Sequence, residues 1–132
     1  MEHRADIWRK YLIGNTSDIH DKRKIYHNII TIFPYSIPDK IDTLIARDMP
    51  RTTFKGNNFL KVETTKKIIE SLLHQYIQVM PCDGYMQGFA YIMAVLYHVY
   101  SKHDIEHALS DTFWSFAAII SIIRPTIPDN DP

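Results

Sequence analysis

The sequence is poor in cysteine and has no excess of charge of either sign. Its 132 residues include a single cysteine, Cys82, so no disulfide can form within the chain, which is typical of a reducing compartment. The 15 acidic and 15 basic residues give a formal net charge of zero, which argues against a general attraction to nucleic acid. The most apolar stretch, residues 113–123, is shorter than the roughly 20 residues that cross a bilayer. We therefore expect one soluble, cytoplasmic domain with no transmembrane segment and no nucleic-acid partner.

Two chemical signatures are also missing. The chain has no G-x-x-x-x-G-K-[ST] loop, so we do not expect it to bind a nucleotide by itself. Histidines cluster at His98, His103 and His107 with Asp104 and Glu106 among them, but the H-E-x-x-H arrangement of zinc enzymes is absent. Solvated histidines are the preferred interpretation, and no metal is expected.

Helical periodicity is what the sequence has in abundance. Apolar residues recur every three or four positions in six segments, which predicts an all-α fold of about six helices in one domain. The first three predicted helices are 7–12, ended by Gly14; 18–33, opened by Asp18 and ended by Pro34; and 36–45, opened by a Ser36–Asp39 capping box. The next two are 66–79, capped by Thr64 or Thr65 and ended by Pro81 and Gly84, and 85–100. The last helix begins near Asp104, and its expected apolar face consists of Ile105, Ala108, Leu109, Thr112, Phe113, Phe116, Ala117 and Ile120.

Two short motifs lie in the breaks between these helices. The first is Ile45-Ala-Arg-Asp48-Met-Pro-Arg51-Thr52, where Pro50 ends a helix. The second is Tyr85-Met-Gln87-Gly88. A guanidinium can neutralise charge on a transferring phosphoryl group, and a carboxamide can orient an attacking water. Because neither is a good nucleophile or base, the pair indicates catalysis by positioning and electrostatics.

The two motifs can lie close together although one helix separates them. The segment between Arg51 and that helix could extend up to roughly 40 Å, whereas the helix spans on the order of 20 Å. Asp48 could fix the guanidinium of Arg51 by a charge-assisted hydrogen bond. Simpler interpretations stay open: a solvated Arg–Asp pair, Gln87 as a capping amide, and Tyr85 as an aromatic at the edge of the core.

Together these residues resemble the TBC-domain family, the GTPase-activating proteins of Rab-type small GTPases. The family's I-x-x-D-x-x-R signature is filled by Ile45, Asp48 and Arg51, and its Y-x-Q-G signature by Tyr85, Gln87 and Gly88. The opening R-x-x-x-W-x-x-x-L-x-G pattern is similar to Arg4, Trp8, Leu12 and Gly14. The resemblance extends over residues 4–116. It departs from the family in having Met86 where a cysteine is common, and in stopping before the second helical half.

The resemblance implies a fold and a mechanism. Residues 1–124 would form the N-terminal subdomain of a TBC domain, with the second helical half missing, followed by a proline-rich tail at 125–132. Arg51 would be an arginine finger and Gln87 would orient water, supported by Ile45, Asp48, Thr52, Tyr85 and Gly88. The partner would be a Rab-type GTPase that carries GTP and Mg²⁺, so the chain needs no cofactor of its own. Peripheral association with the membranes of that GTPase is a further expectation.

Three alternatives remain at this point. The chain could be a non-catalytic module that binds a GTPase or another partner, in which case affinity rather than turnover is its function. It could also be a helical scaffold whose motifs have lost their role. Separately, residues 113–123 are apolar on nearly every side, so self-association through the 105–123 helix is one way to cover them.

Overall fold

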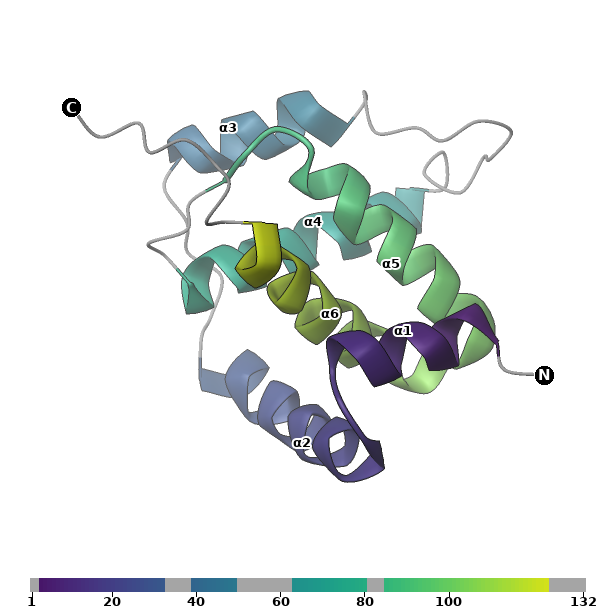
Figure 1. The fold of residues 1–132 in the computed structure, drawn as a ribbon. Coiled ribbons are helices and arrows are strands. Elements are labelled where there is room, and N and C mark those ends of the chain that lie inside the picture. The colour runs from purple at the N-terminus through teal and green to yellow at the C-terminus, as the bar shows by residue number, and fades with distance from the viewer. Residues whose placement is uncertain (1–2, 33–38, 50–62, 81–84, 124–132) are drawn as a thin grey trace.

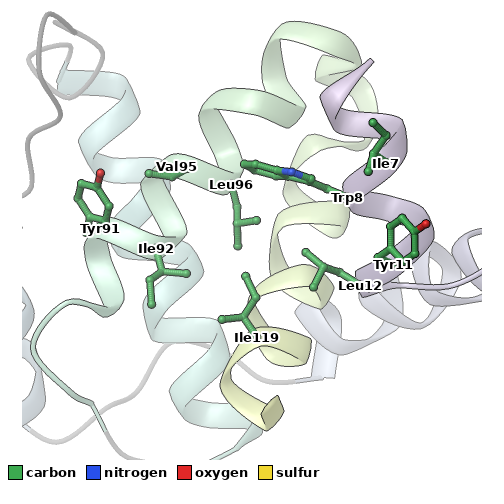
Figure 2. A pocket seen from close by; sticks show the side chains of 9 residues that line it. All are labelled: Ile7, Trp8, Tyr11, Leu12, Tyr91, Ile92, Val95, Leu96 and Ile119. Atoms are coloured by element: carbon green, nitrogen blue, oxygen red, sulfur yellow. The ribbon is translucent and has the colours of Figure 1, made fainter. Parts of the chain in front are cut away.

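The computed structural model describes residues 3–32, 39–49, 63–80 and 85–123 (Figure 1). These residues form six α-helices and one 3₁₀ turn, with no strand among them, which confirms the predicted all-α class. The elements are α1 (Arg4–Leu12), α2 (Thr16–Ile32), α3 (Asp39–Asp48), α4 (Glu63–Val79), α5 (Phe89–His103), η4 (Ile105–His107) and α6 (Ala108–Ile123). None of the described helices is long and apolar enough to cross a membrane.

Helix α6 is the centre of the packing. It contacts α5, α4, α2 and α1, and Figure 1 shows it enclosed among them. Phe113, Phe116 and Ile120 are buried on this helix. The apolar character of residues 113–123 is therefore largely used within the chain, and self-association through the 105–123 helix stays an untested prediction. Helix α3 lies at the edge of the domain, where it packs on α4.

The start of the last helix differs from the prediction. Residues 105–107 form the 3₁₀ turn, and α6 begins only at Ala108. The 3₁₀ turn has three residues per turn rather than 3.6, so it shifts the phase of the side chains that precede α6. Ile105 and Leu109, which we expected on the apolar face, are accordingly 67% and 41% exposed.

Three further helix boundaries also differ. Helix α2 begins at Thr16 rather than near Asp18, because Asn15 is the capping residue. The Asp18 amide donates to Asn15 Oδ1 at 2.9 Å, and the Asn15 amide donates to Asp18 Oδ2 at 3.0 Å. Each residue thus satisfies the other's N–H, as in a capping box.

Helix α4 begins at Glu63, so the predicted caps Thr64 and Thr65 lie inside it. Helix α5 begins at Phe89 instead of Tyr85, because residues before it form a turn. The expected helix ends at Pro34, Pro81 and Gly84, and the expected cap at Ser36, lie outside the described residues.

Gly14 ends α1 as predicted. Its N–H donates to Arg9 O at 3.0 Å, and its φ is +137°. A Cβ at this position would overlap the side chain of Asp18. Glycine is therefore needed both for the backbone conformation and for the tight connection from α1 to α2.

A chain of aromatic rings forms the core. It runs from Tyr26 to Phe113 (5.3 Å between ring centroids), Tyr76 (6.1 Å), Phe116 (4.9 Å) and Phe89 (5.2 Å). The Tyr76–Phe116 and Phe116–Phe89 pairs are edge-to-face and the other two are tilted; edge-to-face pairs add to the stabilisation from burial. The rings come from α2, α4, α5 and α6, so a single cluster fixes these four helices together.

A buried ion cluster ties α1 and α2 to α6. The side chain of Asp111 is 1% exposed, and it accepts hydrogen bonds from Arg9 Nε at 2.7 Å and from Arg23 Nη2 at 2.8 Å. The Arg9 guanidinium carbon also lies 5.1 Å from the ring centroid of Tyr100. Arg9 and Asp111 are thus withdrawn from water at the junction of three helices, whereas the side chain of Arg23 is still 25% exposed.

Candidate functional site

The site begins at the last residue of α3. Asp48 is 8% exposed, and its Oδ2 accepts hydrogen bonds from the hydroxyl of Tyr85 and from the backbone N–H of Gly88, the latter at 3.1 Å. One helical turn earlier, Ile45 is buried in the core and fixes the end of α3. Asp48 of the first motif is thereby hydrogen-bonded to Tyr85 and Gly88, the first and last residues of the second motif.

Tyr85 is held from two directions. Its ring packs edge-on against Phe89 at a centroid distance of 5.6 Å, which joins it to the aromatic core. Partial burial, together with the hydrogen bond to Asp48, raises the pKa of the Tyr85 phenol well above its ordinary value. The phenol therefore stays protonated at neutral pH and remains a donor to the carboxylate.

Gly88 shapes the turn before α5. It is the N-cap residue of α5 with φ +100°, a conformation that residues with a side chain adopt at a cost. The Phe89 amide donates to Met86 O at 3.1 Å, and the Ile92 amide donates to Gly88 O at 3.2 Å. A Cβ on Gly88 would meet no atom within 4 Å, so the requirement for glycine comes from the backbone rather than from space.

Gln87 lies at the surface, between the two anchored residues of the turn. It is exposed and lines a hollow of about 250 Å³ together with Leu44, Arg47, Asp48 and Tyr85. A glutamine so placed can reach a partner, whereas a buried one could not. Arg47, also exposed, was not predicted as a site residue, because a basic residue near a helix end is common and only the fold places it beside Gln87.

The structure thus brings Ile45, Asp48, Tyr85, Gln87 and Gly88 into one region. Arg51 and Thr52 lie outside the described residues, and the roles of all seven residues stay predictions. The sequence permitted the two motifs to converge. In the structure, direct hydrogen bonds join Asp48 of the first motif to Tyr85 and Gly88 of the second.

His103 and His107 do not lie on one continuous helix. His103 is the last residue of α5 and His107 belongs to η4. His107 Nδ1 lies 2.9 Å from Asp104, and this hydrogen bond lowers the pKa of the Asp104 carboxyl. Possible ligand atoms of Asp104, Glu106 and His107 lie within 4.8 Å of one another, but a partly exposed cluster of this kind does not by itself indicate a bound ion.

Comparisons with known proteins agree with the two motifs. A family model for the Rab-GTPase-TBC domain matches residues 1–130. Growth hormone-regulated TBC protein 6 of Caenorhabditis elegans is 36% identical over 62 residues, which are 47% of this chain and 18% of that protein. The chain thus covers only a small part of this relative, and no solved structure gives a significant match. Since the family model spans nearly the whole sequence, the chain belongs to the Rab-GTPase-TBC domain family.

Proposed function

We propose that this chain activates GTP hydrolysis by a Rab-type small GTPase, supplying Arg51 and Gln87 in trans. The observation that carries the proposal is the pair of hydrogen bonds from Tyr85 and Gly88 to Asp48. They hold the end of α3 against the turn that presents Gln87. Membership of the Rab-GTPase-TBC domain family supports the choice of partner.

Chain connectivity limits how far Arg51 can be from this turn. It follows Asp48 by three residues, so their Cα atoms are separated by at most about 11 Å. The hydrogen bonds of Asp48 keep the last residue of α3 beside the turn that carries Gln87, which supports the proposal that Arg51 acts together with Gln87. A guanidinium and a carboxamide could reach one bound nucleotide from this rim.

The division of labour follows from the chemistry of the two side chains. Arg51 would stabilise the negative charge on the γ-phosphoryl group, and Gln87 would orient the attacking water. The GTPase would provide the nucleotide and Mg²⁺. An arginine finger contributes about 10³–10⁵ in rate, equivalent to ~4–7 kcal/mol of activation free energy.

Single-turnover GTP hydrolysis by a panel of Rab GTPases tests the proposal. The wild-type chain should accelerate hydrolysis by at least one GTPase, and Arg51→Lys should remove most of the acceleration because the planar fork is lost. Gln87→Ala should also lower the rate at saturation. Arg47→Lys is the second comparison, because Arg47 lines the same hollow as Gln87: the proposal expects it to keep most of the acceleration, and loss of acceleration in this variant alone would assign the finger to Arg47.

Binding measured in the same experiment separates the alternatives. A GTPase that binds the chain without faster hydrolysis would support the non-catalytic module. Absence of both binding and acceleration across the panel would support the scaffold. Equal stimulation by wild type and Arg51→Lys would show that Arg51 is not the finger.

A further inference from the structure

A basic hollow lies at the opposite end of α5 from Gln87. Its volume is about 620 Å³, and it is lined by His3, Arg4, Ala5, His98, Val99, Lys102 and His103. The first three come from the start of α1 and the other four from the last turns of α5. Because α5 has 15 residues, it separates the hollow from Gln87 by on the order of 20 Å.

Every polar side chain that lines this hollow is basic. Within the part of the chain that the structure describes, no carboxylate forms an ion pair with Arg4 or Lys102. Asp6 forms an ion pair with Arg9 at 3.1 Å, and its Oδ2 lies 3.6 Å from His103 Nε2. Arg4 and Lys102 thus line the hollow, and no described carboxylate is paired with either of them.

The same positive charges affect the pKa of His98. Partial burial lowers its pKa, and the nearby charges of Lys102 and Arg4 lower it further. Like charges held around one space repel each other, and an anion in that space would relieve the repulsion. The rings of His3 and His103 lie 4.9 Å apart at the rim. His103 already faces Arg9 through Nδ1 and Asp6 through Nε2, so His3 is the ring that could donate a hydrogen bond to an anion there.

From this arrangement we propose that the hollow binds an organic phosphate carrying two or more negative charges. Arg4 can hold a phosphate through two parallel N–H donors, and Lys102 adds a point charge from the facing helix. A carboxylate would neutralise only one of the two fixed charges. The volume exceeds what a single phosphate group needs and suits a phosphorylated ring or sugar. The same chemistry occurs in soluble metabolites and in lipid headgroups.

The test uses the whole chain with two probes, soluble inositol trisphosphate and phosphatidylcholine vesicles with or without phosphatidylinositol bisphosphate. Calorimetry should detect binding of the soluble probe, and NMR should show that the probe raises the pKa of His98. Arg4→Ala/Lys102→Ala should weaken binding by at least about tenfold, because charge-assisted contacts are lost. This variant should also raise the pKa of His98 in the absence of probe.

Lys10→Ala/Lys24→Ala is the matched control, since it removes two exposed positive charges from other parts of the helices. It should bind the soluble probe as wild type does. Binding to both probes identifies a lipid headgroup as the ligand source, and binding to the soluble probe alone identifies a free organic phosphate. No binding to either probe, or equal weakening in the control, would overturn the proposal. None of these outcomes depends on GTP hydrolysis, so they are distinct from the test of Arg51.

Discussion

Replacing Tyr85 by phenylalanine removes one hydroxyl from the bond that joins the two motifs. The ring can keep its edge-on contact with Phe89, so the change isolates the hydrogen bond to Asp48. A hydrogen bond to a charged group contributes about 1.5–3 kcal/mol. Tyr85 is only partly buried and Asp48 keeps the N–H of Gly88, so we expect a loss near the lower end, about 1.5–2 kcal/mol.

Thermal and urea unfolding followed by circular dichroism would measure this loss. For a domain of this size it corresponds to a decrease in Tm of roughly 5–10 °C. Tyr11→Phe is the matched control, because Tyr11 is 77% exposed and surface changes usually stay within about 0.5 kcal/mol. A double-mutant cycle with Asp48→Ala should give a coupling free energy of roughly 1–2 kcal/mol between the two side chains.

Two results would refute this reasoning. The first is a Tyr85→Phe protein that unfolds at the same temperature and urea concentration as wild type. The second is a coupling free energy near zero, which would mean that Asp48 and Tyr85 stabilise the domain independently. Either result would remove the physical link on which the position of Arg51 relative to Gln87 depends.

Three further substitutions test other features. Gly88→Ala should destabilise the domain by about 1–2 kcal/mol in urea unfolding, because alanine is strained at positive φ although space is available. Asp111→Asn should cost about 3 kcal/mol, the lower end for a broken buried pair, because Arg9 keeps its ion pair with the partly exposed Asp6 and Arg23 is 25% exposed; Asp21→Asn on the exposed face of α2 should cost little. Because the pKa of His98 is lowered in the folded state, the unfolded state takes up a proton at higher pH than the folded state. The free energy of unfolding should therefore fall as pH drops below about 6.5. His98→Gln should reduce that fall, and identical pH profiles for the two proteins would contradict the assignment.

The helices were predictable because their signals are local. The apolar stripe of α4, with Ile69, Leu72 and Tyr76, repeats over about three turns and was recognised without tertiary information. Errors occurred where the chain changes from one geometry to another. In the sequence, Tyr85 and Gln87 continue the apolar and polar spacing of α5, so the helix was predicted to begin at Tyr85. In the structure these residues lead into a turn at Gly88, whose N–H is bonded to Asp48 at the end of α3.

The buried ion cluster illustrates what local patterns cannot give. Asp111 stands next to Thr112 and Phe113, and a carboxylate in such a segment is expected to face water. Its partners lie 102 and 88 positions away along the chain. Only the fold brings Arg9 and Arg23 to it, so neither its burial nor its charge compensation can be inferred from neighbouring residues.

Asp48 has a wider role in the proposed site than the sequence indicates. The sequence suggested that it serves Arg51 alone, whereas its Oδ2 is bonded to Tyr85 and Gly88. These two residues flank Gln87, so loss of the carboxylate would release the turn that carries the glutamine as well as the helix end that leads to Arg51. Asp48→Ala should therefore lower GTPase stimulation to the level of the Arg51→Ala/Gln87→Ala double variant, rather than to that of Arg51→Ala alone. Asp48 would then act as a positioning residue for both side chains.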